Sequence, residues 1–140
     1  LDMLQAMNTG HDGSMGTVHA NTPQDAVARI ETMVAMGGLD IPPHAVRQQI
    51  TSAIQVVVQV QRLSDGSRKL ISLQEVHGLK DGEIELREIF KFEQVGLNDQ
   101  GRVKGRFRAT GLVPAFLDRL KVRGCAVRQD LFDPRQVEEC

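Results

Sequence analysis

The chain has 140 residues, 41% of them hydrophobic, and a formal net charge of −1 at neutral pH. That length and apolar content suffice for one domain and exclude a disordered tail, and the near-zero charge gives no overall attraction to nucleic acid or membranes. Two cysteines are too few for a disulfide framework or a zinc knuckle, no apolar run is long enough to span a bilayer, and the start lacks the layout of a signal peptide, so we expect a cytoplasmic protein.

The first predicted elements are a helix, a short strand and a second helix. Apolar residues at helical spacing predict a helix over 1–8, and we expect the chain to be cut there from preceding elements of the same domain. The run MGTVHA predicts a β-strand over 15–20. Thr22 followed by proline is typical of a helix start, which predicts a helix over 23–36 that ends at a Gly-Gly pair.

The middle of the chain changes from helical to strand periodicity. Pro43 begins a predicted helix with an apolar face that extends to Ile54. β-branched and alternating residues then predict strands over 56–63, 68–77 and 83–92, separated by turns that each contain Asp-Gly. These three strands predict an antiparallel meander.

The residues from 98 onward form a predicted appendage. A strand over 103–109 and a helix over 115–123 are expected there, which divides the chain into domains 1–97 and 98–140. The appendage lacks the aromatic spacing of a nucleic-acid module, so its cations indicate a solvated face or a subunit contact and no nucleic-acid partner is expected. The cations are Arg102, Lys104, Arg106, Arg108, Arg119, Lys121, Arg123 and Arg128.

The segment GHDGSMGTVHAN at 10–21 concentrates polar groups around the predicted strand 15–20. His11 and His19 are candidate metal ligands by residue type, but no second cluster of Cys, His or carboxylate completes a set, so no metal site is expected. His19 has two open interpretations, a functional group at the carboxyl end of a strand or a core histidine bonded to a backbone carbonyl.

Other residues are weaker candidates for chemistry. Ser14 has no nucleophile elbow around it and Cys125 has no nearby histidine, so nucleophilic catalysis is not expected. Three arginines have the charge to reach an anionic ligand, although ion pairs with Glu31 or Asp65 would explain them equally well. They are Arg29, Arg47 and Arg62.

The sequence GHDGSMGTVHANTPQDAVARIETMV resembles the histidine-box segment of the traffic ATPases of type II/type IV secretion and pilus assembly, a RecA-like P-loop family. LDMLQAMNTG, before it, resembles the helix that follows the family's Walker B strand. RQQITSAIQVVVQVQRLSDGSRKLISLQEVHG and the later IFKF are similar to the family's downstream elements. The resemblance is strongest to the CpaF-like branch, which powers Flp (tight-adherence) pilus assembly, and it extends to about residue 120.

The resemblance implies roles for the polar segment. His19 would sense or polarise the γ-phosphate end of ATP, His11 would help couple nucleotide state to movement, and Thr17 and Asn21 would hold the loop by hydrogen bonds. A neutral histidine near its ordinary pKa of about 6.5 can donate to a phosphate oxygen or accept from water. The second-tier candidates for contacts to the nucleotide or between subunits are Arg29, Arg47 and Arg62.

The resemblance also implies the fold and the parent function. We expect an α/β fold, the C-terminal half of a RecA-like P-loop ATPase domain with an antiparallel meander and a small helical tail. The parent would be a hexameric ATPase that uses ATP and Mg²⁺ to export pilin or another substrate, held at the inner membrane by a platform protein.

The 140 residues contain no GxxxxGK[ST] loop and no Walker B carboxylate. Phosphoryl transfer needs both, so we expect this chain alone to bind ATP weakly and to be inactive. The alternative is a non-catalytic oligomerisation or interaction module.

Overall fold

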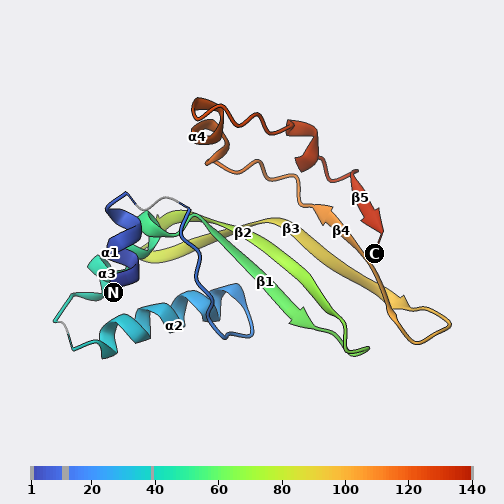
Figure 1. The fold of residues 1–140 in the computed structure, drawn as a ribbon, viewed down its shortest axis with the longest axis horizontal. Helices are drawn as coiled ribbons and strands as arrows, with labels where there is room; N and C mark the ends of the chain where they lie inside the picture. The colour runs from blue at the N-terminus through green and yellow to red at the C-terminus, as the bar shows by residue number, and fades with distance from the viewer. Residues whose placement is uncertain (1, 11–12, 39, 140) are drawn as a thin grey trace. The chain divides into compact units, whose positions relative to one another are not determined.

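A computed structural model describes residues 2–10, 13–38 and 40–139 (Figure 1), and its contacts form two compact units. The first unit comprises Leu1–Val57 and Val76–Leu86, and the second comprises Val58–Glu75 and Arg87–Cys140. The units interleave along the chain because strands of the sheet pass from one to the other. The expected division into a domain over 1–97 and an appendage over 98–140 stays a prediction.

Among the described residues of the first unit there are three helices, and all three were predicted. They are α1 (Asp2–Asn8), α2 (Pro23–Met36) and α3 (Pro43–Ala53). Proline occupies the first helical position of both α2 and α3. An N–H at this position has no acceptor within the helix, so proline loses no hydrogen bond there, and its fixed φ suits a helix. These local signals placed the helix starts correctly.

In the described ranges, five strands form one sheet in the order β1-β2-β3-β4-β5. Because short turns join β1 to β2 to β3, neighbouring strands run antiparallel, which confirms the predicted meander. The predicted strand over 103–109 is also confirmed, whereas β5 was not predicted. The strands are β1 (Val56–Arg62), β2 (Arg68–Lys80), β3 (Glu83–Leu97), β4 (Val103–Ala109) and β5 (Val137–Glu139).

The β3–β4 pair has a register shift between Gln94 and Gly96. The hairpin closes through Asn98, whose N–H donates to the Arg102 carbonyl at 2.8 Å and whose carbonyl accepts from Gly101 at 2.9 Å. The Asn98 side chain also accepts from the Arg102 N–H at 2.9 Å. An irregularity of this kind bends a strand and raises its local twist.

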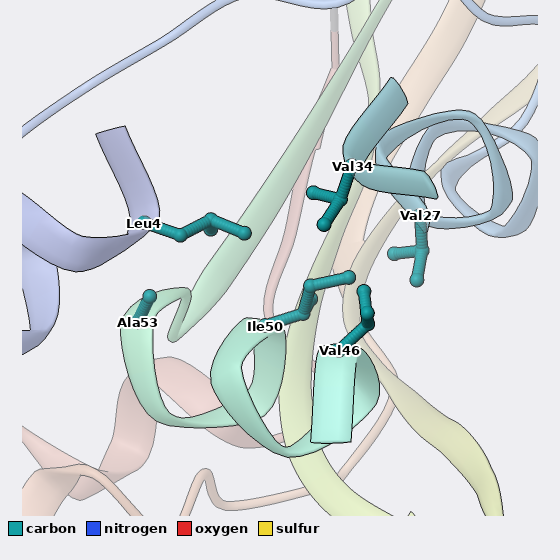
Figure 2. Close-up of a cluster of buried hydrophobic side chains, with 6 residues drawn as sticks. All are labelled: Leu4, Val27, Val34, Val46, Ile50 and Ala53. Atoms are coloured by element: carbon teal, nitrogen blue, oxygen red, sulfur yellow. The ribbon is translucent and has the colours of Figure 1, made fainter. Parts of the chain in front are cut away.

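The core of the first unit is aliphatic and contains residues from all three helices (Figure 2). Ile50 on α3 is fully buried, and Leu4 on α1 is 2% exposed. Because the apolar residues of each helix recur three or four positions apart, each helix offers one apolar stripe to the others. The cluster comprises Leu4, Val27, Val34, Val46, Ile50 and Ala53.

The second unit has its own core, built by β3 and the C-terminal segments. Ile89 on β3 is 1% exposed and packs with Leu117 of α4 (Leu117–Val122) and Phe132 of the 3-10 helix η1 (Gln129–Phe132). Phe90 lies 5.7 Å, centroid to centroid, from the ring of Phe132. The helix predicted over 115–123 is therefore confirmed in a shorter form, and η1 was not predicted.

The strand predicted over 15–20 is wrong. Residues 14–20 have no regular secondary structure, and Met15 is 95% exposed. A strand exists only when another backbone pairs with it, and the described part of the chain supplies no partner to this segment. The overall fold class, mixed α/β with an antiparallel sheet, is as predicted.

Candidate functional site

The polar segment is joined to α2 by a well-formed helix start. Thr22 has an extended backbone (φ −134°, ψ 160°), and its hydroxyl accepts a hydrogen bond from the Asp25 N–H at 3.1 Å. Pro23 follows as a buried first helical residue. This cap supplies a partner for one of the four amide groups that a helix start leaves unpaired, and it sets where the preceding segment meets the helix.

His19 lies just before this cap with an exposed side chain and an anchored backbone. The Arg29 guanidinium on α2 reaches back, and its Nη1 donates to the His19 carbonyl oxygen at 3.0 Å. The imidazole of His19 is exposed to solvent. The interpretation of His19 as a buried core histidine is therefore wrong, and the side chain is available to a ligand or a partner.

The other predicted members of the segment are only partly described. Thr17 and Asn21 flank His19, and both are exposed. His11 lies outside the described residues. In the described ranges, no group of three or more His, Cys, Asp or Glu side chains is arranged to hold a metal ion. The expected roles of Thr17 and Asn21 in holding the loop stay predictions.

Arg47 on α3 ties three parts of the first unit together. Its Nε donates to Glu31 of α2 at 3.0 Å, and its Nη1 contacts Glu83 Oε1 and the Gly82 carbonyl, each at 2.8 Å. The hydrogen bond and charge of Glu31, with the charge of Glu83, raise the pKa of Arg47 above its ordinary value. The ion pair with Glu31, one of the two alternatives left open by the sequence, is thus present.

Arg62 belongs to the second unit, at the end of β1. Its guanidinium lies over its own hairpin turn, where Nη2 is 3.6 Å from the position that a Cβ on Gly66 would take. The alternative partner Asp65 instead accepts hydrogen bonds from Ser67 and from the Val103 N–H. The structure therefore brings Arg29 to His19, while Arg47 and Arg62 have separate local surroundings.

Sequence reasoning missed one feature of the second unit, a hollow lined by residues of its two hairpin turns and of the strands beside them. The basic residues of the tail stood out in the sequence, but Lys69 lies more than thirty positions earlier and was not grouped with them. Two turn motifs could have indicated this hollow, SDGS at 64–67 and NDQG at 98–101, because the strands that these turns join lie in one sheet.

No helix in the described ranges is both long enough and apolar enough to cross a bilayer.

The fold and the polar segment define an α/β unit with an exposed histidine next to a capped helix, and comparison with known proteins identifies the family. A family model described as type II/IV secretion system protein matches residues 1–121. The chain therefore belongs to the type II/IV secretion system protein family, and its fold is mixed α/β.

Three relatives are named as conjugal transfer proteins. One from Mycobacterium tuberculosis (strain H37Rv) is 45% identical over 73 residues, which are 52% of this chain and 20% of the relative. TrbB of Rhizobium radiobacter is 32% identical over 68 residues, 49% of this chain and 20% of the relative. TrbB of Sinorhizobium fredii is 31% identical over 86 residues, 61% of this chain and 25% of the relative. The matched part spans a quarter or less of the length of each of these relatives.

Proposed function

We propose that this chain is part of a secretion ATPase and that His19 contacts the γ-phosphate end of ATP in the assembled enzyme. The observation that carries the proposal is the combination at His19 of an exposed imidazole and a backbone held by Arg29 at 3.0 Å. An anchored backbone limits the positions that the side chain can reach, which is what a group that reports on a phosphate requires.

The described residues fit one contact to the nucleotide rather than a whole nucleotide site. A neutral imidazole can donate to a phosphate oxygen, and Thr17 and Asn21 can steady the loop around it. His11 would act from the adjoining loop. ATP supplies the bond that is hydrolysed, with Mg²⁺ neutralising its charge. The phosphate cradle and the Mg²⁺ ligands would come from other parts of the parent protein, so this chain alone is expected to hold ATP weakly.

Within the family, we assign the parent protein to the CpaF-like branch, which drives Flp pilus assembly. The sequence segments that resemble this branch support the assignment. The names of the relatives instead favour a conjugal transfer system as the one that the parent protein powers. In either system the parent would form a hexamer at the cytoplasmic side of the inner membrane, bound to a platform protein. Arg29, Arg47 and Arg62 remain candidates for contacts to the nucleotide domain or between subunits.

The test joins residues 1–140 to the N-terminal part of a type II/IV secretion ATPase that carries the GxxxxGK[ST] loop. We expect the joined protein to hydrolyse ATP and His19→Ala to remove most of that turnover, about tenfold or more, because general acid–base or polar contacts of this kind contribute at least that much. His44→Ala, which removes an exposed histidine from α3, is the matched control. Equal activity of the His19 and His44 variants would refute the proposal.

The alternative function, a non-catalytic interaction module, is favoured by one surface. Val56, Val58 and Val60 alternate along β1 and are 37%, 48% and 56% exposed, and β1 is an outer strand of the sheet. Apolar side chains on an edge strand are prone to pair with another chain. If the joined protein oligomerises through this strand but shows no turnover above background, the interaction module is the better description.

A further inference from the structure

The two units of the chain carry formal charges of opposite sign. The first unit, Leu1–Val57 with Val76–Leu86, contains eight acidic and three basic residues, a formal net charge of −5. The second unit, Val58–Glu75 with Arg87–Cys140, contains ten acidic and fourteen basic residues, a formal net charge of +4. The net charge of −1 of the whole chain is therefore the balance of two oppositely charged units.

In the second unit, three cations surround one carboxylate on one face of the β3–β4 pair. The register places Lys91 directly opposite Arg108 on the neighbouring strand. Two positions further along β3, Glu93 lies opposite Arg106, so all four side chains share one face. The Glu93 carboxylate lies 3.0 Å from the Lys91 ammonium, 3.1 Å from Nη2 of Arg108 and 3.7 Å from Nε of Arg106. We call these four residues the base-rich cluster.

One carboxylate does not compensate the cations of the base-rich cluster. Like charges directly opposite one another destabilise a strand pair, and Lys91 and Arg108 are in this arrangement. The Nε atoms of Arg106 and Arg108 are buried, and the described part of the chain offers neither of them a hydrogen-bond partner. The register of β5 places Glu139 opposite Arg106, and with that residue counted the cations still outnumber the carboxylates by three to two. Each of the three cationic side chains is at least 36% exposed, so a partner can reach them.

The first unit contains the opposite arrangement, in which two carboxylates share one cation. Arg47 contacts Glu31 at 3.0 Å and Glu83 at 2.8 Å. The Glu83 side chain is 72% exposed, so a partner can approach its carboxylate while it still contacts Arg47. We call these three residues the acid-rich cluster.

We propose that the base-rich cluster of one copy of this chain docks against the acid-rich cluster of a second copy. Surfaces of opposite charge steer association and fix its orientation, whereas contacts between units of like charge are disfavoured. Exposed ion pairs each contribute little, so the association is weak and sensitive to salt. Because the contact joins two different surfaces, it is heterologous and can repeat from copy to copy.

The position of Glu93 favours a protein surface over a small free anion as the occupant. A free anion at the centre of the three cations would meet this carboxylate, which repels it. Carboxylates spaced over a protein surface can instead contact the outer parts of the guanidinium groups. This contact does not include His19, and the inference does not depend on the proposed contact to ATP.

The experiment measures self-association of the full chain by sedimentation velocity at about 0.01 M and about 1 M salt, where the Debye length is about 30 Å and about 3 Å. Arg108→Glu reverses a charge in the base-rich cluster, and Glu83→Lys reverses one in the acid-rich cluster. The matched control is Arg119→Glu at an exposed position of α4, which changes the charge of the second unit by the same amount outside the cluster. We expect association at low salt that is lost at high salt. Each cluster reversal should weaken the Kd about tenfold or more, and the control less than about threefold.

An equal mixture of the two reversal variants tests the contact directly. The Arg108→Glu chain keeps its acid-rich cluster and the Glu83→Lys chain keeps its base-rich cluster, so together they can form one intact contact. We expect each variant alone to be monomeric where the wild type associates, and the mixture to form a dimer that grows no further. If circular dichroism shows that Arg108→Glu is unfolded, Arg108→Gln takes its place, because it removes the charge without adding a carboxylate.

Three results would overturn the proposal. The first is a wild-type chain that stays monomeric at low salt up to about 1 mM. The second is a control that weakens association as much as the cluster reversals, or a mixture that stays monomeric. The third is association that survives high salt and both reversals, which would assign the contact to an apolar surface such as β1, because salt does not screen apolar contacts.

Discussion

A single methyl group at Gly105 should destabilise the second unit. Gly105 lies on β4, is buried and pairs with Gln94 of β3. A Cβ at this position would lie 2.1 Å from Cζ and 2.6 Å from Cε2 of the Phe92 ring, and 2.8 Å from the backbone oxygen of Glu93. The ring could turn aside, but the backbone oxygen belongs to the neighbouring strand and moves only with it. Position 105 therefore requires glycine, because the Phe92 ring and the Glu93 backbone lie too close to leave room for a side chain.

Two opposing terms set the magnitude for Gly105→Ala. Overpacking of a well-packed interior typically costs about 1–3 kcal/mol, and the backbone obstacle puts this case in the upper half of that range. Alanine also lowers the conformational entropy of the unfolded chain, which returns about 0.4–1 kcal/mol. The overpacking term is larger, so we expect a net loss of about 1–2.5 kcal/mol in the free energy of unfolding.

The assay is urea unfolding followed by circular dichroism, with Lys104→Ala at the exposed neighbouring position as the control. A double-mutant cycle with Phe92→Leu separates the two obstacles, because leucine removes the ring atoms and leaves the Glu93 oxygen. In that background Gly105→Ala should cost less, with a coupling energy of about 0.5 kcal/mol or more. A Gly105→Ala variant within about 0.5 kcal/mol of wild type, or one that costs the same in both backgrounds, would refute this reasoning.

Two further predictions concern a helix cap and an acidic turn. Thr22→Ala removes the hydroxyl that accepts from the Asp25 N–H and should lower the free energy of unfolding by about 1 kcal/mol. The control Thr32→Ala, at an exposed position inside the same helix, should be neutral or slightly stabilising. Equal urea midpoints for the two variants would contradict the capping role. Because the folded-state pKa of Asp65 is about 2, below the ordinary aspartate value of 3.8, the unfolded chain binds the proton more readily and stability is lost as the pH falls from about 4 to about 2. Asp65→Asn should flatten this part of the pH dependence of unfolding, and an unchanged pH profile would show that Asp65 makes no such contribution.

Much of the fold could be predicted because its signals are local. The bounds of α2 follow from Thr22, the proline after it and the Gly-Gly pair at its end, all within the segment itself. The meander followed from alternating residues separated by Asp-Gly turns. The family was also readable from the sequence, since a resemblance depends on the order of residues and not on their packing.

The sequence by itself therefore determined the helices, the hairpins and the family. The tertiary structure decided which residues and segments those elements contact. Residues 15–20 have the composition of a strand, yet pairing requires a second backbone, which residue order does not supply. Arg47 donates a hydrogen bond to Glu31, sixteen positions away, and Asp65 accepts one from the Val103 N–H, thirty-eight positions away. Such partners are set by the path of the whole chain, because a hydrogen bond forms wherever donor and acceptor lie within about 3 Å, whatever their separation in sequence.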